Sequence, residues 1–415
     1  LNNFSQEQSN SITVGTDSVT VKACTLSSSE TIATVEAIIA PHEGKNKFAV
    51  RTFTFTTKDG DEKTYELPST VTFETGKAYS FTFTLSWPTF DGMTNCYIVA
   101  PDTEFTFPVS RAYTYEKKAF TTTLHTGGEY TGTFDAAIVW ADAAVISDTP
   151  TVLGSGNTAE VTVKTTSTSG NAVVKICRSD NGETVWSYHI WVTDYTGAET
   201  YTNTYTYSSK QYEFIFMDRN LGATAAGTGL FYQWGRKDPF PTTDGTPTTG
   251  SWSKVTTDAT LGTVTNTIKN PGVFYIASSA SEYDWHYASR DNTLWGHDAN
   301  GGIKTIYDPC PAGWRVPVNS GMSADTSPWY GFTKDNGGTF ANGYNWGTNA
   351  VYPAAGNRSN SSGSLYRVGT GGYYWSASPY SSASGTSLLL FDSGTVYVFN
   401  NAHRASGLSV RCSQE

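Results

Sequence analysis

The sequence predicts a mainly β protein, in which two N-terminal β-sandwich modules precede a loop-rich α+β domain. Short runs of alternating apolar and polar residues recur along the chain, as half-buried strands require. Turn-forming residues separate many of these runs at intervals of about 8 to 12 residues, which is typical of β-sandwiches. Aromatic residues make up 14% of the 415 residues, and this share favours strands and excludes a disordered chain.

The first module is expected over residues 1–89. Its clearest feature is the hairpin predicted by FAVRTFTFTTKDGDEKTYELP, because Asp59-Gly60 tolerates the positive φ angles of a tight turn. A buried run, TIATVEAIIAP, stops at Pro41, and KAYSFTFTLS alternates like a half-buried strand. Prolines and a change of composition then place a boundary near residue 89.

A second module is expected over residues 90–198. The segments NAVVKIC and ETVWSYHIWVT flank a turn at residues 178–182, whose Asn-Gly pair is a strong hairpin signal. Further strand-like runs are GEYTGTFDAAIVWADA, AVISDTPTVLG and AEVTVKTTS. Residues 195–198 read as a short linker to the next domain.

Residues 199–415 are expected to form one domain, rich in Trp, Gly, Asn and Ser, with short strands. Long polar loops in a compact domain are commonly functional. The sequence places such loops at residues 242–265, 285–300, 325–348 and 355–372. The segments GTSLLLFDSG, TVYVFNN and LSVRCSQE read as the strands that close the domain.

Charge and motif content exclude several classes of function. The net charge of −10 disfavours a nucleic acid or an anionic membrane as partner, and no apolar run is long enough for a membrane helix. The first residues, LNNFSQEQSNS, do not resemble a signal peptide, so an exported protein would have lost its signal. No nucleophile elbow, metalloprotease motif, phosphate loop or dinucleotide fingerprint occurs, and we expect no catalytic residues and no enzyme activity.

Metal binding has little support in the sequence. His286 and His297 are neighbours among six scattered histidines, but a turn-rich stretch separates them and we predict no zinc site. Calcium binds several oxygen ligands, and four residues offer them here: Asp291, Asn292, Asp298 and Asn300. Because their spacing matches no EF-hand and they are common turn residues, we predict no required cofactor.

Five motifs in order carry a resemblance to a known family: FMDRNLGA, FYQWGRKDPF, IYDPCPAGWRVP, GYYWSASP and GLSVRC. Residues 214–412, which contain them, resemble C-type-lectin-like and "major paralogous" domains, which place Cys-Pro-x-Gly-Trp early and Val-Arg-Cys late. Residues 34–88 resemble the closing strands of the fimbrillins that build type V pili. Residues 95–195, from NCYIVAP to WSYHIWVTDY, are similar to the middle module of fimbrillin-like surface proteins.

The resemblance implies a secreted bacterial surface protein at or near the tip of a fimbrium on the outer membrane. Its partners would be other pilus subunits, joined by β-strand exchange at the N-terminal domain. That domain looks short, so leading strands would be missing or would come from another chain. Only residues 413–415 follow Cys412, and these are too few to donate a strand. This predicts that the protein caps the end of the pilus.

The motif positions also imply a disulfide between Cys310 and Cys412. Closing a loop of 103 residues (412 − 310 + 1) would stabilise the domain by about 4 to 5 kcal/mol in the chain-entropy model. Cys96 and Cys177 are either a second pair or free thiols, and Cys24 is expected to be a small buried residue. Formylglycine-generating enzymes share a related fold but need a free cysteine pair, which a structural disulfide would remove.

The resemblance also marks residues that are expected to be structural. Trp234, Trp314 and Trp375 lie in the motifs beside glycine and apolar residues, and we expect them to pack inside the domain. A polar set is expected to hold the loops through buried ion pairs and backbone hydrogen bonds: Asp218, Arg219, Asn220, Arg315, Arg404 and Arg411.

The candidate ligand-binding residues lie in the long loops. Aromatic faces stack on sugar rings, and several exposed aromatic side chains that converge on one patch mark a recognition site. The candidates are Trp252, Trp295, Trp329, Tyr330, Trp346 and Arg358.

We therefore predict an exported cell-surface adhesin, a fimbrial tip subunit that binds a host or microbial surface ligand, with a glycan as one option. Two alternatives stay open: a structural pilus or surface subunit that binds no ligand, and an enzyme that acts on glycans. Absence of glycan binding with normal pilus assembly would favour the first. Glycan cleavage that is lost with one carboxylate would favour the second.

Overall fold

The computed structural model divides the chain into two compact units, residues 1–89 and 90–415. In the first unit the structure describes four short strands. In the second unit it describes residues 94–109, 130–197, 199–224, 227–279, 283–297, 302–332, 339–340, 343–346, 350–380, 385–392 and 395–415. The predicted modules 90–198 and 199–415 both lie in the second unit, and the division into three domains stays a prediction.

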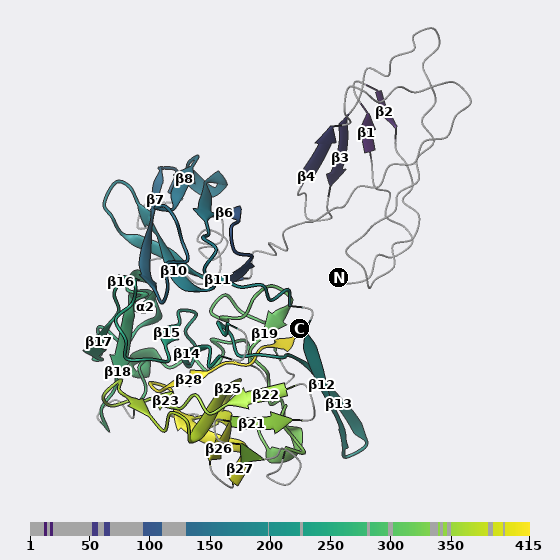
Figure 1. The fold of residues 1–415 in the computed structure, drawn as a ribbon, viewed down its shortest axis with the longest axis vertical. Coiled ribbons are helices and arrows are strands. Elements are labelled where there is room, and N and C mark those ends of the chain that lie inside the picture. The colour runs from purple at the N-terminus through teal and green to yellow at the C-terminus, as the bar shows by residue number, and fades with distance from the viewer. Residues whose placement is uncertain are drawn as a thin grey trace. The chain divides into compact units, whose positions relative to one another are not determined.

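The described part of the first unit consists of two antiparallel strand pairs (Figure 1). β1 (Ile12–Val14) pairs with β2 (Asp17–Val19), and β3 (Thr52–Thr56) pairs with β4 (Glu62–Glu66). Because Thr56 lies opposite Glu62, β3 and β4 form the hairpin that the Asp-Gly turn predicts. The predicted run before Pro41, the segment KAYSFTFTLS and Cys24 lie outside the described residues.

The first part of the second unit is a β-sandwich-like pair of sheets. The larger sheet has five strands, in the order β16 (Thr249–Gly250), β7 (Phe134–Ala141), β10 (Gly170–Arg178), β11 (Thr184–Val192) and β5 (Cys96–Val99). The smaller sheet has three, in the order β6 (Glu104–Pro108), β9 (Glu160–Lys164) and β8 (Thr151–Leu153). A short 3-10 helix, η1 (Gly156–Thr158), precedes β9.

The hairpin of β10 and β11 is confirmed. The two strands pair antiparallel from Gly170 opposite Val192 to Cys177 opposite Thr184. In the turn, Gly182 has a φ of 72°, a region that glycine enters without steric cost, and its N–H donates to the carbonyl of Arg178 (2.8 Å). The Asn-Gly pair therefore reverses the chain as predicted.

The loop-rich domain contains two larger sheets. One has four strands, in the order β12 (Thr200–Tyr207), β13 (Lys210–Met217), β29 (Ser413–Gln414) and β19 (Trp314–Arg315). The other has eight, and its main path runs β15 (Phe240–Pro241), β14 (Leu230–Gln233), β28 (Gly407–Ser409), β25 (Gly371–Pro379), β26 (Gly385–Asp392) and β27 (Thr395–His403). Off this path, β23 (Asn357–Arg358) pairs with β28 and with β24 (Leu365–Tyr366).

Smaller elements complete the domain. β17 (Ser253–Thr256) pairs in parallel with β18 (Val273–Ile276), and β20 (Thr339–Phe340), β21 (Gly343–Trp346) and β22 (Ala350–Pro353) form an antiparallel sheet. The described helices are short: α2 (Val264–Lys269), η3 (Tyr287–Ser289) and η4 (Ala324–Thr326). The described chain is therefore mainly β, as predicted, and none of its helices is long and apolar enough to cross a membrane.

The five-stranded sheet is covered on both faces. One face packs on the smaller sheet around Val174, Ile176 and Ile190, and the other packs on the loop-rich domain through Trp140 and Trp191. All nine residues of β11 are buried, which is the pattern of a strand with no solvent-facing side. Figure 1 shows β10 and β11 between the small sheet and the strands β14 and β28, so one face of this sheet contributes to the sandwich core and the other contributes to the core of the loop-rich domain.

Candidate functional site

The predicted disulfide between Cys310 and Cys412 is present, and both cysteines are fully buried. Cys310 begins a turn that Asp308 organises, because the Asp308 carboxylate accepts from the backbone N–H of Cys310 and of Val316 (2.8 Å each). Burial raises the pKa of Asp308. The covalent bond therefore joins a well-packed turn to the residue directly before the last described strand, β29.

The strand that follows Cys412 is held on both edges. In β29, Ser413 pairs with Phe216 of β13 and with Arg315 of β19. The buried ammonium of Lys304 donates to the carbonyl of Cys310 (3.1 Å) and forms an ion pair with Glu415 (3.2 Å). The segment 412–415 is thus an internal part of its own sheet.

Asn220 and Arg411 are buried and hold segments together, as predicted, whereas the ion pair of Asp218 with Arg219 in the same FMDRNLGA motif is only half-buried. Arg411 donates through Nε and Nη2 to Oδ1 of Asn220 (3.0 and 2.7 Å) and through Nη1 to the carbonyl of Asp218 (2.8 Å). Its Nη2 also donates to the carbonyl of Val351 (2.6 Å). One arginine therefore joins the end of β13, the start of β22 and the segment before the terminal cysteine.

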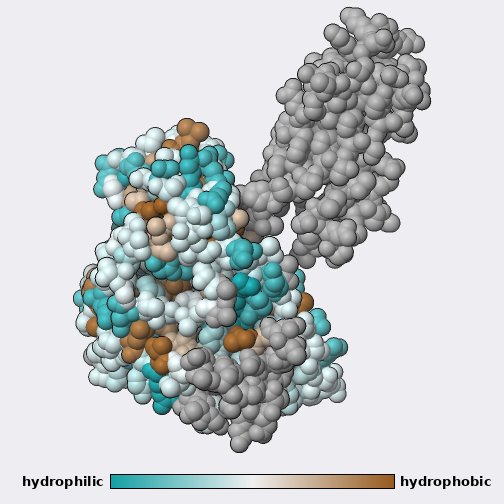
Figure 2. Space-filling view, viewed as in Figure 1, coloured by the Kyte–Doolittle hydropathy of each residue, from teal (hydrophilic) through white to brown (hydrophobic). Residues whose placement is uncertain are grey.

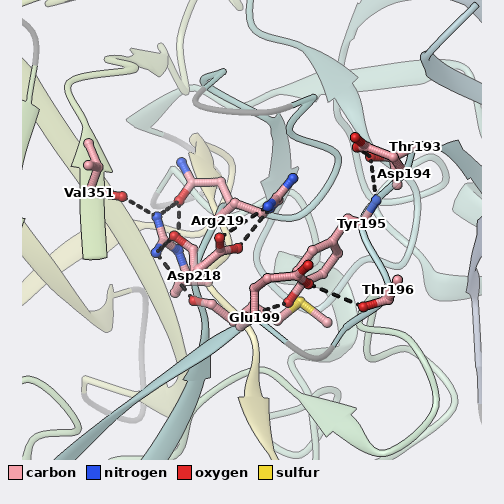
Figure 3. Close-up of polar contacts among 11 residues, drawn as sticks. Thr193, Asp194, Tyr195, Thr196, Glu199, Asp218, Arg219 and Val351 are labelled. Atoms are coloured by element: carbon pink, nitrogen blue, oxygen red, sulfur yellow. Dashed lines mark hydrogen bonds and ion pairs between the residues drawn. The ribbon is translucent and has the colours of Figure 1, made fainter. Parts of the chain in front are cut away.

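The link between the sandwich and the loop-rich domain is built from the same motif (Figure 3). Arg219 forms a two-pronged ion pair with Asp218 (2.7 and 3.0 Å) and stacks over the ring of Tyr195 at 4.2 Å. The Tyr195 hydroxyl donates to the carbonyl of Glu199 (3.1 Å), whose carboxylate accepts from Thr196. Tyr195, Thr196 and Glu199 are therefore tied to one another by hydrogen bonds, and the Asp218–Arg219 pair packs on Tyr195.

Two further predicted arginines hold loops inside the domain. Arg404 is buried, stacks over Trp234 at 4.2 Å and donates to the side chain of Asn292. Arg315 donates to the carbonyl of Gly302 (2.9 Å). Of the three motif tryptophans, Trp234 and Trp375 are fully buried and Trp314 is half-buried, so the structural interpretation holds for the two that are enclosed.

A buried polar cluster at the sandwich boundary was not found from the sequence. The Lys237 ammonium donates to the carbonyl and hydroxyl of Ser187 on β11 and to the Asp238 carboxylate (2.8 Å), and Ser187 donates to the same carboxylate (2.6 Å). Both ions are almost fully enclosed. The motif FYQWGRKDPF contained the signal for this cluster. Its adjacent opposite charges, Lys237 and Asp238, must be paired if this apolar motif is buried.

A neutral histidine contributes to the same boundary. The amide nitrogen of Asn171 donates to Asp142 and Gly222, so its oxygen is the atom that accepts from His189 Nε2 (2.9 Å). The other ring nitrogen, Nδ1, then accepts from the hydroxyl of Tyr232 (3.4 Å). Burial lowers the pKa of His189 to about 3, which keeps the ring uncharged.

The structure corrects the predicted ligand-binding surface. Trp295 and Trp329 were expected to be exposed because they lie in loop-like sequence, and both are buried. The Trp295 indole packs near Trp234 (5.6 Å) and donates to the carbonyl of Tyr307 (2.9 Å). The Trp329 indole donates to the hydroxyl of Tyr352 (3.1 Å). A loop-rich domain has few strands to supply its core, so loop tryptophans fill it.

Arg358, another predicted ligand-binding residue, is also buried. Its guanidinium donates to the carbonyls of Pro241 (2.9 Å), Thr243 (2.6 Å) and Gly363 (2.9 Å), and it pairs with Asp244 (3.0 Å). The Arg358 guanidinium therefore joins residues 241–244 to the loop that contains Gly363. The expectation that Arg358 faces a ligand is therefore wrong.

The other candidates are partly enclosed or lie outside the description. Trp252 is half-buried and lies under the Arg358 guanidinium at 4.4 Å. Tyr330 is half-buried against Tyr205 (4.7 Å between ring centres). The side chain of Trp346 is outside the described residues. The five candidates whose side chains are described do not form the converging exposed patch that was predicted from their loops.

Exposed aromatic residues occur instead near the start of β25. Tyr366 is 57% exposed, Val368 is 52% exposed, and Tyr397 is 49% exposed. Arg367, which lies between Tyr366 and Val368 in the sequence, is also exposed. The predicted loop 355–372 contains this turn, but the sequence does not show which of its two arginines is enclosed.

Neither metal hypothesis gains support from the described residues. Groups of three or more metal-binding side chains are not found among them. His297 Nδ1 lies 2.9 Å from the Ser378 hydroxyl, and burial lowers the pKa of His286 to about 4. The oxygens of Asp291 and Asn292 accept from Thr293 and Arg404, while Asp298 and Asn300 are outside the description.

Cys96 and Cys177 are both buried free thiols. Burial raises the pKa of Cys96, and Cys96 packs at the boundary with the loop-rich domain among the residues around Trp140 and Trp191. The open alternative between a second disulfide and free thiols is thereby resolved in favour of two free thiols.

Comparison with known proteins finds no matching family model, no matching curated protein and no matching solved structure. The resemblance to fimbrillin-like and C-type-lectin-like modules therefore rests on the sequence motifs alone.

Proposed function

We propose that the protein is an exported, non-enzymatic cell-surface adhesin, a fimbrial tip subunit whose residues 199–415 bind a surface ligand. Residues 1–89 and 90–198 would attach the protein to the pilus and support the binding domain. In this proposal the loop-rich domain has a C-type-lectin-like fold, and the neighbouring pilus subunit joins at the first unit by strand exchange.

One observation carries this proposal: the buried Cys310–Cys412 disulfide closes the loop-rich domain. Disulfides form and persist in oxidising compartments outside the cytosol. A domain with many loops and short strands gains rigidity from such a bond, and rigid loops bind with less loss of conformational entropy. A binding domain exposed at the cell surface needs both a bond that persists outside the cytosol and rigid loops.

The pairing of β29 makes it unsuited to be the strand that is exchanged between subunits. A shaft subunit has to offer a strand to its neighbour, whereas β29 pairs inside its own domain with β13 and β19. Residue 412 before it is held by the disulfide. This segment is thus used internally and is poorly suited to strand donation.

Two measurements test the proposal. Immunogold labelling of intact cells should mark one end of each fimbrium, and labelling along the shaft would contradict the tip location. The full chain should bind at least one ligand on an array of surface glycans and extracellular-matrix proteins. Failure to bind any of them would contradict the adhesin function.

The burial of Trp295, Trp329 and Arg358 favours a second candidate, a structural surface subunit without a ligand. The two candidates differ in one outcome. If deletion of the gene abolishes pilus assembly and the full chain binds nothing on the array, the structural function is correct.

A further inference from the structure

The turn between β24 and β25 is a rigid platform. The N–H groups of Thr370 and Gly371 both donate to the carbonyl of Arg367 (3.1 and 2.9 Å), and Gly369 donates to the carbonyl of Ala354 (2.8 Å). The turn also lies directly on Gly356, where an added Cβ would come within 2.4 Å of the Tyr366 carbonyl oxygen. The backbone of residues 366–371 is therefore held from both sides.

Arg367 occupies an unusual backbone conformation at the tip of this turn. Its φ is 55°, a region that side chains other than those of glycine, asparagine and aspartate rarely adopt. Strained conformations persist where the surrounding structure enforces them, and they are frequent at functional sites. The Arg367 side chain at this position is exposed.

The Arg367 side chain is held between two tyrosines. Its Nη1 donates to the hydroxyl of Tyr373 (3.3 Å), and its guanidinium lies 5.5 Å from the centre of the Tyr366 ring. Hydrogen bonds to the Tyr366 and Tyr373 side chains raise the pKa of Arg367. The cation is thus positioned before any ligand arrives, although it is exposed to water.

The surface continues across the neighbouring strands. Tyr373 of β25 pairs with Leu390 of β26, and Leu390 pairs with Tyr397 of β27. Tyr373 and Tyr397 therefore lie in one row on the same face, two strand spacings or about 10 Å apart. With Tyr366 and Val368, they form what we name the Tyr366 platform: Tyr366, Arg367, Val368, Tyr373 and Tyr397.

This platform brings a cation, exposed tyrosines and an exposed valine together at the surface. Figure 2 shows that the visible described surface is mainly hydrophilic or neutral, with hydrophobic residues in small groups. Leu153 and Ile303 are more exposed but are single aliphatic side chains. Tyrosine and arginine are the residue types that dominate binding hot spots, and rigid aromatic side chains lose little entropy on binding.

We propose that the Tyr366 platform binds the carboxylate-bearing sugar of a surface glycan. The sugar ring stacks on the Tyr366 ring, and its carboxylate accepts from the Arg367 guanidinium. This inference rests on the proposed adhesin function and specifies its ligand.

Charge complementarity selects an acidic sugar over a neutral one. Guanidinium donates two parallel hydrogen bonds to a carboxylate, and such charge-assisted bonds are stronger than bonds to a neutral hydroxyl. The net charge of −10 on the whole chain repels polyanions at long range. The platform therefore suits a glycan with one isolated acidic sugar and disfavours a sulfated polymer.

The test uses the full chain on a glycan array with matched probes. One set of oligosaccharides ends in a carboxylate-bearing sugar, a second set ends in its neutral counterpart, and heparin serves as the polyanion. We expect roughly tenfold or stronger binding to the acidic set, the scale of a hot-spot contact. Equal binding to both sets, or preference for heparin, would overturn the acidic-sugar assignment.

Variants then locate the site. Arg367→Asn removes the cation while keeping a residue that tolerates positive φ, and Tyr366→Ala removes the stacking ring. Each should weaken binding roughly tenfold or more without changing thermal melting. The matched control is Lys210→Gln, because Lys210 also lies over a tyrosine, Tyr212 at 4.8 Å, next to a turn of the same domain. It should bind like the unmodified protein.

The outcomes separate this inference from the adhesin function. Glycan binding that neither Arg367→Asn nor Tyr366→Ala weakens would overturn the Tyr366 platform and leave the adhesin function standing. Binding to a matrix protein but to no glycan would also overturn the Tyr366 platform and leave the adhesin function standing. A full chain that binds no glycan and no matrix protein would overturn both.

Discussion

Arg358 and Arg367 lie on either side of β24, and each lies over an aromatic ring, yet their surroundings differ completely. Arg358 is fully buried over Trp252 and donates to three backbone carbonyls. Arg367 is exposed near Tyr366 and donates to a tyrosine hydroxyl at the surface. The same residue type therefore holds loops together inside the domain in one place and lies among tyrosines at the surface in the other.

The comparison teaches that enclosure decides the role of a polar side chain in this domain. A buried donor or acceptor that loses its partner costs the full desolvation penalty, whereas an exposed group regains water. Substitution of a buried polar group should therefore lower the free energy of unfolding, whereas substitution in the Tyr366 platform should change it little. The following predictions test this division, from the largest expected effect to the smallest.

Loss of the disulfide should have the largest effect. Cys310→Ser opens the loop to Cys412, and the chain-entropy model gives a loss of about 4 to 5 kcal/mol. Because β29 follows Cys412 directly, the last residues should also become sensitive to carboxypeptidase. Denaturant unfolding and limited proteolysis measure both effects. Mass spectrometry that finds both thiols free in the native protein would contradict the premise.

Asp238→Ala should destabilise the protein by about 3 kcal/mol or more, because it leaves the Lys237 ammonium buried without its carboxylate. The matched variant is the double substitution Lys237→Met with Asp238→Ala, which removes both charges and should recover much of the loss. Urea unfolding measures the difference. If the double variant is as unstable as the single one, the uncompensated charge is not the cause.

Arg358→Ala should cost about 2 to 3 kcal/mol, because it leaves the carbonyls of Pro241, Thr243 and Gly363 without this donor. Arg358→Lys keeps the charge but cannot reach three carbonyls at once, so we expect an intermediate loss. Thermal unfolding of the two variants provides the measurement. A melting temperature equal to that of the unmodified protein would show that Arg358 is replaceable.

Stability should decrease as the pH falls below 6.5. The buried ring of His189 has a pKa of about 3, and that of His286 a pKa of about 4, both lowered from 6.5. The unfolded chain therefore binds more protons below pH 6.5, and each histidine removes about 1.4 kcal/mol per pH unit until its folded pKa is reached.

Two buried carboxylates have the opposite effect on the free energy of unfolding at low pH. Burial raises the pKa of Asp142 and of Asp308, so the folded state takes up their protons first and part of the acid loss is offset. His189→Gln should flatten the dependence of unfolding free energy on pH between 6.5 and 5. An unchanged slope in urea titrations at pH 7, 6 and 5 would contradict the assignment of His189.

Arg367→Asn should have the smallest effect on stability, within about 0.5 kcal/mol, because substitutions at exposed positions usually change little. Asparagine also tolerates the positive φ of this position. Differential scanning calorimetry provides the check against Arg358→Ala. A loss as large as that of Arg358→Ala would show that Arg367 is structural, and the contrast between the two arginines would disappear.

Local sequence chemistry determined the elements that depend only on near neighbours. Asp59-Gly60 and Asn181-Gly182 predicted two hairpins, because glycine supplies the positive φ of a tight turn. The alternation of apolar and polar residues predicted the mainly β character. The motif positions implied the disulfide between Cys310 and Cys412, and the structure contains it.

The burial of individual loop residues could not be predicted in the same way. Trp295 and Trp329 lie in loop-like sequence without a repeating apolar pattern, but strands distant in the chain enclose them, including β25 near Trp295 and β13 near Trp329. Loops carry no periodicity that would indicate an inner face. Their exposure therefore depends on contacts that the sequence order does not reveal.

The sequence by itself determined the β class of the chain, its hairpins, and the polar motif that surrounds Arg411. Only the tertiary structure decided that Arg358 is enclosed and Arg367 exposed, and that β11 is buried on both faces. In VWSYHIWV, Ser187 and His189 alternate with apolar residues, which is the pattern of a one-sided strand and does not indicate burial on both faces. The physical reason is that turns follow from local φ preferences, whereas burial follows from which distant segments pack together.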